Sequence, residues 1–238
     1  MDKLKLVKFR SLANKKDLDR TINIITTGEF WCTKLWNMND PMEGVYNTSN
    51  RDIIPKLFTE KNKYVICSFS DNSDDNIRKK PLQNPLLWGY YANGFKGIAI
   101  EIEVDESNVK KVDYISRTDI DNLIGEGSLD EDIAREIMTK KLKCWNLEYE
   151  WRYLKASNED SYKIGKIIRV YIGRPYITTE NYKEIALNSN PLKNYLEYQE
   201  TIEKLCDSYG VEVQYANIGK SNKVVFQERR RRVNPIIE

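Results

Sequence analysis

The sequence predicts an α+β fold, in which helices flank a mixed, mainly antiparallel sheet of seven or eight strands. Segments in which apolar and polar residues alternate recur along the whole chain, as expected for half-buried strands. Between them lie segments whose apolar residues recur every three or four positions, as in amphipathic helices. The 238 residues are 40% hydrophobic and 11% aromatic, which is enough for a buried core and typical of a globular protein.

The first half of the chain is predicted to alternate between strands and helices. Strands are predicted where apolar residues alternate with polar ones or form a short apolar run: residues 4–9, 29–33, 64–70 and 96–104. Helices are predicted where apolar residues recur at helical spacing: residues 17–26, 51–63 and 85–94. Gly28 and Gly94 are suited to end the first and the third helix. Residues 37–44 have the composition of a turn, and the polar segment 71–84 is expected to be a mobile loop.

The second half of the chain is predicted to contain further strands and helices. Residues 109–115 are expected to form a hairpin with the strand at 96–104. A helix is predicted from Ser128, which forms a capping-box pattern with Glu131, and its buried stripe extends to Leu142. A strand should follow directly. The remaining strands are predicted at residues 145–153, 163–173, 211–215 and 223–227, and the remaining helices at 179–187 and 191–209.

One domain is predicted over residues 1–238, with a basic C-terminal segment at 220–238. The net charge is only +2, but Arg229, Arg230, Arg231 and Arg232 are consecutive. Such a run can contact the phosphates of a nucleic acid, and its alternative interpretation is a solvated strand end or tail. No apolar run approaches the roughly 20 residues of a membrane span. The first residues also lack a signal segment, so we expect a cytoplasmic protein without membrane contact.

The cysteine and histidine contents limit the chemistry that the chain can perform. There is no histidine, which excludes Ser-His and Cys-His nucleophilic pairs and histidine metal ligands. The four cysteines are widely spaced among apolar neighbours: Cys32, Cys67, Cys144 and Cys206. We therefore expect four small buried thiols, and neither a metal site nor a disulfide. Acid or base chemistry falls to Asp, Glu, Lys, Tyr or Cys.

The strand predicted at residues 145–153 is the strongest candidate for a functional site. Its bulky residues alternate without interruption with Asn146, Glu148, Glu150 and Arg152. This alternation places two carboxylates and a guanidinium in a row on one face, roughly 7 Å apart. Such a row can perform chemistry. Its alternative interpretation is a solvated outer face whose charges pair with those of neighbouring strands.

Five motifs, taken as a set and in this order, resemble a widespread bacterial family of unassigned function. They are F-R-S at 9–11, N-D-P-M-E at 39–43, C-S-F-S at 67–70, L-L-W-G-Y-Y-A at 86–92 followed by K-G-I-A-I-E, and W-N-L-E-Y-E-W-R at 145–152. The resemblance covers roughly residues 4–175. Membership implies little chemistry, because that family carries only a domain-of-unknown-function label.

The layout is also similar, more loosely, to the ADP-ribosyltransferase fold, a split sheet with a basic residue on its first strand and Glu-x-Glu on a late strand. This resemblance implies an enzyme that cleaves NAD and transfers ADP-ribose to an unknown protein or nucleic acid, as a bacterial toxin or phage-defence effector. It implies Glu150 as the catalytic carboxylate and Glu148 as the acceptor-side residue. The residues implied to bind NAD are Arg10, Ser11, Thr33, Arg152 and an aromatic, Trp88 or Tyr91.

The chemistry of NAD cleavage suits this assignment, although the sequence departs from the fold's pattern. Loss of nicotinamide builds positive charge on the ribose, which a fixed carboxylate stabilises without metal or histidine. The second strand, however, lacks a Ser-Thr-Ser motif, for which Cys32 and Thr33 are the nearest match. No second tyrosine falls at the expected spacing. Trp88 and Tyr91 have the alternative interpretation of core aromatics.

Two other functions remain open at this point. A metal-dependent nuclease or phosphodiesterase would hold magnesium through carboxylates: Asp40, Glu43, Glu101 and Glu103. Against it, no lysine follows Glu101 or Glu103 at the two-residue spacing that such sheet nucleases favour. Asp40 and Glu43 have the alternative interpretation of a turn held by its own hydrogen bonds. The other function is a non-catalytic binding module whose acidic row recognises a basic partner.

Overall fold

The contacts of the chain divide it into two compact units, each drawn from three separate stretches. The computed structural model describes residues 3–38, 52–73, 80–116, 131–175, 188, 190–219 and 223–229. Unit 1 comprises Met1–Lys8, Thr27–Asp75 and Ile102–Lys166. Unit 2 comprises Phe9–Thr26, Asn76–Glu101 and Ile167–Glu238. The single domain expected over residues 1–238 stays a prediction.

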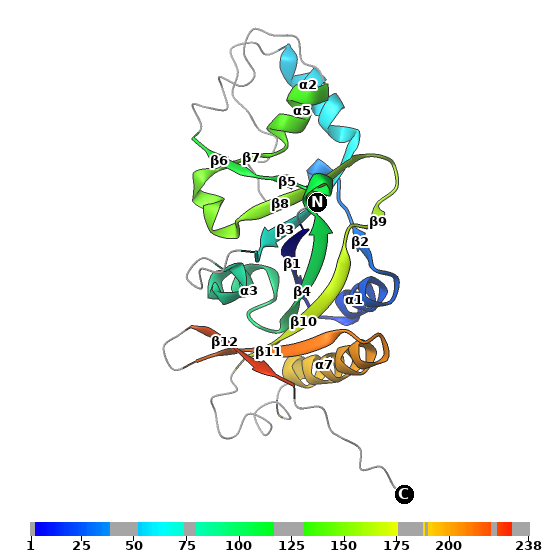
Figure 1. The fold of residues 1–238 in the computed structure, drawn as a ribbon, viewed down its shortest axis with the longest axis vertical. Coiled ribbons are helices and arrows are strands. Elements are labelled where there is room, and N and C mark those ends of the chain that lie inside the picture. The colour runs from blue at the N-terminus through cyan, green and yellow to red at the C-terminus, as the bar shows by residue number, and fades with distance from the viewer. Residues whose placement is uncertain are drawn as a thin grey trace, which may run out of the picture. The chain divides into compact units, whose positions relative to one another are not determined.

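Eight strands form one mixed, mostly antiparallel sheet, in the order β12-β11-β10-β4-β1-β3-β8-β5 (Figure 1). Their bounds are β1 (Lys3–Ser11), β3 (Tyr64–Asp71), β4 (Gly97–Asp105), β5 (Lys110–Lys111), β8 (Glu150–Ala156), β10 (Lys166–Arg174), β11 (Glu212–Ile218) and β12 (Val224–Glu228). The described helices and strands confirm the predicted α+β class and the predicted number of strands. The split sheet of the ADP-ribosyltransferase fold stays a prediction.

Within unit 1, β3 is the central strand because both of its faces are apolar. It pairs antiparallel with β1 and with β8, and β5 adds to β8. Two further pairs lie outside the large sheet: β2 (Glu29–Trp31) with β9 (Ser161–Lys163), and β6 (Asp113–Ile115) with β7 (Lys140–Leu142). The short 3-10 helices are η1 (Leu35–Asn37), η4 (Glu106–Asn108) and η5 (Lys143–Glu148).

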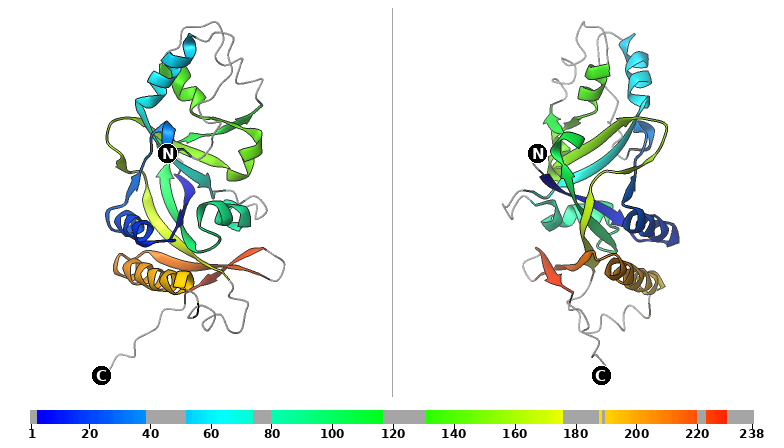
Figure 2. Two further views of the ribbon diagram at one scale, coloured as in Figure 1. Left: turned by 180° about the vertical axis from the view of Figure 1, so that it is seen from behind. Right: turned by 45° about the vertical axis from the view of Figure 1, so that its right-hand side comes forward.

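The α-helices that the structure describes in unit 1, α2 (Ile53–Asn62) and α5 (Glu131–Ile137), lie side by side in both views of Figure 2. Leu57 of α2 packs against Ala134 and Ile137 of α5, and all three are buried. Burial of these side chains between the helices holds α2 and α5 together, because apolar area is removed from water.

The helices described in unit 2 are α1 (Lys15–Thr27), η3 (Pro81–Gln83), α3 (Pro85–Tyr91) and α7 (Asn190–Ser208). β10 and β11 are parallel, and α7 lies between them in the chain, since parallel strands need a crossover connection. β12 returns antiparallel to β11. Gly97 and Gly173 sit at close backbone approaches, where a Cβ atom would stand 2.3 Å from the carbonyl oxygens of Arg10 and Phe95, respectively.

The prediction of a strand over residues 145–153 is wrong for the first half of this range. Residues 143–148 form the 3-10 helix η5, and Tyr149 adopts the left-handed conformation, with φ 46° and ψ 50°. The strand begins only at Glu150. The alternating bulky residues therefore span a helix and a strand, and the face with Glu150 and Arg152 is buried, not solvated.

Three other sequence predictions are corrected by strand pairing. Residues 109–115 do not form a hairpin with β4, because β5 pairs with β8 and β6 pairs with β7. The helix predicted to reach Leu142 ends at Ile137, since Leu142 belongs to β7. The strand predicted at 163–173 is divided into β9 and β10.

The other predicted helices and strands are confirmed to within a few residues wherever the structure describes them, whereas residues 81–83 of the loop expected at 71–84 form η3, in which Pro81 and Leu82 are buried. Asp40, Glu43, Ser128, the helix expected at 179–187 and Arg230, Arg231 and Arg232 lie outside the described residues, as do residues 74–79 of the loop expected at 71–84. All four cysteines are free thiols, but Cys144 is exposed, which contradicts its expected burial. None of the described helices is both long enough and apolar enough to span a membrane.

Candidate functional site

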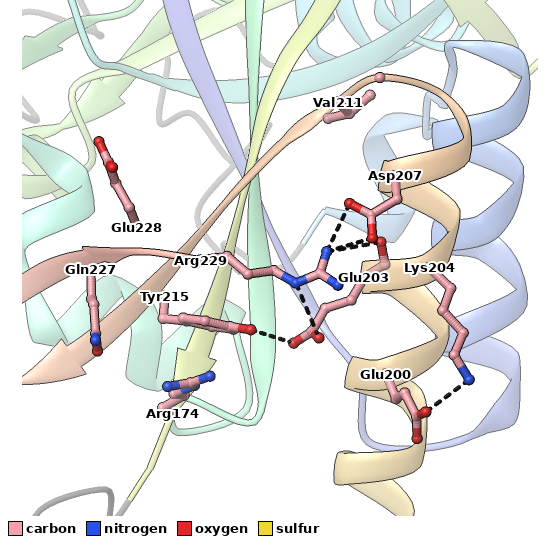
Figure 3. Close-up of a pocket in the computed structure, with 11 residues that line it drawn as sticks. Arg174, Glu200, Glu203, Lys204, Asp207, Val211, Tyr215, Gln227, Glu228 and Arg229 are labelled. Atoms are coloured by element: carbon pink, nitrogen blue, oxygen red, sulfur yellow. Dashed lines mark hydrogen bonds and ion pairs between the residues drawn. The ribbon is translucent and has the colours of Figure 1, made fainter. Parts of the chain in front are cut away.

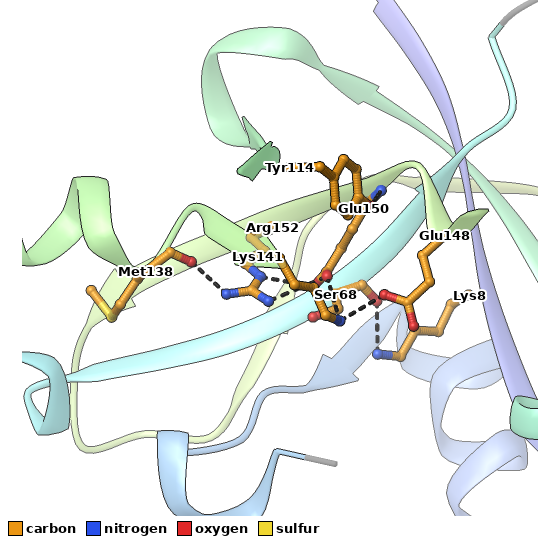
Figure 4. Close-up of polar contacts among 8 residues, drawn as sticks. All are labelled: Lys8, Ser68, Tyr114, Met138, Lys141, Glu148, Glu150 and Arg152. Atoms are coloured by element: carbon orange, nitrogen blue, oxygen red, sulfur yellow. Dashed lines mark hydrogen bonds and ion pairs between the residues drawn. The ribbon is translucent and has the colours of Figure 1, made fainter. Parts of the chain in front are cut away.

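Four charged side chains lie buried together in unit 1 and form the candidate site (Figure 4). Lys141 comes from β7, Glu148 from η5, and Glu150 and Arg152 from β8. Each residue is between 1% and 6% exposed. Two carboxylates and two cations give this ionic quartet a formal charge of zero, which is the condition for burying charge at tolerable cost.

The Glu150 carboxylate is the most heavily bonded member of the quartet. The Arg152 guanidinium donates from Nε to Oε1 at 2.7 Å and from Nη2 to Oε2 at 3.2 Å, a bidentate pairing. The Lys141 ammonium donates to Oε2 at 3.0 Å. Both carboxylate oxygens are therefore occupied, and Oε2 is shared by two donors.

The two cations have further partners that fix their positions. Lys141 also donates to Oε2 of Glu148 at 2.6 Å, and its Nζ lies 4.9 Å from the centre of the Trp145 ring. Arg152 donates from Nη1 to the backbone carbonyl of Met138. The lysine thus bridges the two glutamates, and the arginine connects β8 to the end of α5.

Local backbone geometry explains how these side chains meet. The left-handed conformation of Tyr149 turns the chain from η5 into β8, and the backbone carbonyl of Tyr149 accepts from the amide of Asp71 at 2.8 Å. The register of β6 with β7 places Tyr114 opposite Lys141. The Tyr114 hydroxyl in turn accepts a hydrogen bond from the backbone amide of Glu150 at 2.8 Å.

The electrostatics of the quartet keep Glu150 ionised. Burial by itself would raise the pKa of this carboxyl, but the charges of Arg152 and Lys141 outweigh burial and lower the pKa to about 2. Burial raises the pKa of the neighbouring Tyr114 hydroxyl, so that the phenol stays neutral. The site therefore presents a permanent, rigidly held carboxylate in surroundings from which water is excluded.

Sequence reasoning found three members of the quartet and missed Lys141. It assigned residues 128–142 to one helix, on which Lys141 was not part of the buried stripe. A charge balance would have indicated it: two buried carboxylates beside one guanidinium leave a net negative charge, which requires another cation. The alternation of residues 145–153 indicates only that the carboxylates lie on the polar face of a strand, and it does not indicate whether this face is buried.

Thr33, predicted to bind NAD, belongs to unit 1 and makes local contacts. Its backbone amide and carbonyl exchange hydrogen bonds with Ile66, both at 2.8 Å. Its hydroxyl donates to the carbonyl of Lys34 at 3.3 Å. Thr33 therefore ties the segment after β2 to β3, and its role toward NAD stays a prediction.

Of the other residues predicted to bind NAD, Arg152 belongs to the quartet in unit 1, whereas Ser11 and Trp88 belong to unit 2 and have structural contacts there. Ser11 donates to the carboxylate of Asp17 at 2.8 Å, at the start of α1. The Trp88 ring is fully buried and stacks on Phe95, with centroids 5.0 Å apart. Its indole N–H donates to the backbone carbonyl of Leu82 at 2.8 Å. These contacts are those of a core aromatic.

Arg10 and Tyr91 are both only partly buried. The Tyr91 ring makes an edge contact with Tyr90, with centroids 6.3 Å apart. Of the two aromatics proposed to stack on nicotinamide, Tyr91 is therefore the one whose surface is not closed by the core. The roles expected for Arg10 and Tyr91 stay predictions.

Of the four carboxylates considered for a metal site, the two that the structure describes, Glu101 and Glu103, each have a cationic partner. Glu101 accepts from Arg169 at 3.1 Å and from the hydroxyl of Tyr171 at 3.2 Å. Glu103 accepts from Lys3 at 2.8 Å, and this contact lowers the pKa of Glu103. Across the described ranges, no group of three or more Cys, Asp or Glu side chains is arranged to hold a metal ion.

A hollow of about 870 Å³ lies in unit 2, between α7 and the β11–β12 hairpin (Figure 3). Arg229, the first residue of the arginine run, lines it and is not a solvated tail. Its guanidinium donates to both carboxylate oxygens of Asp207 at 2.8 Å and contacts Glu203 at 3.6 Å. The Arg174 guanidinium stacks on the Tyr215 ring at 3.1 Å from its centre.

Comparison of the chain with protein-family models, curated proteins and solved structures gives no match in any of the three.

Proposed function

We propose that this chain is an ADP-ribosyltransferase-like enzyme that cleaves NAD at its nicotinamide glycosidic bond, with Glu150 as the catalytic carboxylate. One observation carries the proposal: the Glu150 carboxylate is only 3% exposed and is held by two cations, Arg152 and Lys141, which favour its ionised form. An oxocarbenium-like transition state is stabilised best by a negative charge that is already in place and needs no reorganisation.

The bond changes assign separate tasks to the two glutamates. The bond between C1′ of the ribose and the nicotinamide nitrogen breaks, and its electron pair leaves with nicotinamide, which becomes neutral. An acceptor atom then bonds to C1′ and loses a proton. Glu150 supports the positive ribose, while Glu148 orients the acceptor and takes this proton. The acceptor is a macromolecule or, in its absence, water.

The observed contacts impose a condition on this chemistry. Both oxygens of Glu150 already accept hydrogen bonds, so a ribose hydroxyl must compete with Lys141 for Oε2. The competing interpretation is that the quartet only stabilises unit 1, as neutral buried ion clusters do. The two interpretations predict different turnover for a variant that removes Glu150 together with one cation and so keeps the quartet neutral: turnover falls if Glu150 is catalytic and is unchanged if the quartet is only structural.

Nicotinamide release from NAD, measured in excess EDTA, is the first test. The informative variant is the double substitution Glu150→Gln with Lys141→Met, which removes one anion and one cation and keeps the cluster neutral. Per folded molecule, it should lose at least ~100-fold in turnover, as expected for a positioned catalytic group. Wild-type turnover in this double variant would show that Glu150 has no catalytic role.

Two matched controls separate catalysis from charge balance. Glu148→Gln with Lys141→Met removes the same charges but retains the Glu150–Arg152 pair, so nicotinamide release into water should persist while transfer to acceptors in bacterial lysate is lost. Glu103→Gln alters a Glu-x-Glu residue on β4 and should retain both activities. If the wild type neither releases nicotinamide nor binds NAD by calorimetry, the proposal fails, and a magnesium-dependent nuclease or a binding module takes its place.

A further inference from the structure

Two buried thiols of unit 1 face each other across a strand pair. Thr33 and Ile66 exchange both backbone hydrogen bonds at 2.8 Å, so they form the hydrogen-bonded pair of an antiparallel bridge. One step further along this register, Cys32 lies opposite Cys67. Adjacent positions of this kind form the non-hydrogen-bonded pair, whose Cα atoms are about 4.5 Å apart.

The surrounding contacts confirm that the register continues past Thr33. Phe30 and Phe69 are opposite each other two residues beyond the cysteines, and their rings are in edge contact with centroids 5.4 Å apart. Since side chains two residues apart share a face of a strand, Cys32 and Cys67 point to the same side as these phenylalanines. The backbone amide of Cys32 donates away from Cys67, to Asp160 at 2.6 Å.

The Cα separation expected for this register lies within the range of disulfides. Disulfides join residues whose Cα atoms are about 4.4–6.8 Å apart and whose Cβ atoms are about 3.5–4.5 Å apart. Both cysteines are free and 1% exposed. Contact with Cys67, followed by burial, raises the pKa of the Cys32 thiol, so the two sulfur atoms are close enough to influence each other.

We propose that Cys32 and Cys67 form an oxidisable dithiol that closes to a cross-strand disulfide with a small disulfide such as oxidised glutathione. One protein thiolate attacks the glutathione disulfide, whose S–S bond breaks and releases one glutathione. The second protein thiolate attacks the mixed disulfide and releases the other. Both protein sulfurs are oxidised, the glutathione disulfide is reduced to two thiols, and the two protein protons go to them.

Closure connects the segment after β2 to the central strand β3 and encloses η1 and α2 in one covalent loop. The raised pKa of Cys32 leaves little thiolate in the folded protein, so the reaction is slow there and proceeds when the strand pair opens. Once formed, the bond restricts the unfolded chain. A disulfide of this kind typically raises the melting temperature of a chain of this size by about 4–16 °C.

The test measures the equilibrium between the free dithiol and the disulfide, not the rate of disulfide formation. Burial slows this rate but does not change the distance between the two cysteines. Reduced Cys144→Ser protein is unfolded in urea and refolded in mixtures of reduced and oxidised glutathione, then acid-quenched, alkylated and mapped by mass spectrometry. The same mixture in urea gives the value for the unfolded chain. We expect the ratio of Cys32–Cys67 disulfide to free dithiol to be at least ~10-fold higher after refolding.

Cys206 serves as an internal control, because it is buried in unit 2 and its pKa is raised to about 12, chiefly by burial. It should remain a thiol after refolding. Cys32→Ala should abolish the disulfide and the rise in melting temperature. If Cys32→Ala folds poorly, Cys67→Ser provides the same test. Equal disulfide ratios in folding and unfolding buffer, or separate glutathione adducts on the two cysteines, would overturn the proposal.

Discussion

Replacing Glu150 with Gln should lower the unfolding free energy of unit 1 by about 3 kcal/mol or more at neutral pH. The pKa of Glu150 is lowered from 4.5 to about 2, which corresponds to about 3 kcal/mol of preferential binding of the ionised form. The variant also leaves Lys141 and Arg152 facing one remaining carboxylate. Removing one partner of a buried ion pair costs about 3–5 kcal/mol, so the two estimates agree.

The pH dependence of this loss has a definite sign. The folded-state pKa of Glu150 lies below its unfolded value, so its contribution is fully present above about pH 4.5 and disappears as the pH falls toward 2. The difference in stability between the wild type and Glu150→Gln should therefore narrow over this window. It should be constant between pH 6 and 8.

Urea unfolding followed by circular dichroism at pH 7 and pH 3 measures both effects. Adding Lys141→Met to Glu150→Gln restores a formally neutral cluster and should recover part of the lost stability, because the net buried charge returns to zero while Glu148 loses its contact with Lys141. A loss smaller than about 1 kcal/mol at pH 7, or a loss that is the same at pH 3, would refute the reasoning that the quartet holds Glu150 ionised.

Three further predictions concern packing and geometry. Arg152→Lys cannot reproduce the bidentate contact and should cost about 1.5–3 kcal/mol, measured by urea titration; an unchanged midpoint would contradict the observed pairing. Trp88→Ala should cost about 3–5 kcal/mol and abolish the cooperative melting of unit 2, because the ring is fully buried; a mild effect in calorimetry would argue against its core role. Gly97→Ala should prevent folding, since the new Cβ would lie 2.3 Å from the carbonyl oxygen of Arg10. Gly89→Ala places its Cβ where nothing lies within 4 Å, and it should stabilise α3 by about 0.5–1 kcal/mol. Soluble expression tests the first variant, and the melting temperature tests the second.

The central strands and the long helices could be predicted from the sequence because their local patterns agree with their tertiary environment. In β3, a short apolar run predicted a strand buried on both faces, and Val65 and Ile66 are each 1% exposed. The helix predicted at residues 191–209 is observed as α7, and Cys206, expected to be a buried thiol, is fully buried. Such elements need no information from distant parts of the chain.

The candidate site could be predicted only in part because its geometry depends on distant contacts. A perfect alternation over residues 145–153 predicted one strand, but contacts with Lys141 bring Glu148 inward on a 3-10 helix. Pattern reasoning treats each charged residue separately and expects it in water. The neutrality of a buried cluster is a property of four residues on three elements, which no local window contains.

The interleaving of the two units along the chain has a consequence for protein engineering and synthesis. Because each unit is assembled from three stretches that alternate with those of the other, no single cut releases either unit as one contiguous fragment. Truncation is therefore unsuited to assigning an activity to one unit. During translation, β3 is complete at Asp71 but its partner β8 is complete only at Ala156, so over this interval the nascent chain carries an edge of β3 whose backbone groups are not yet paired with β8.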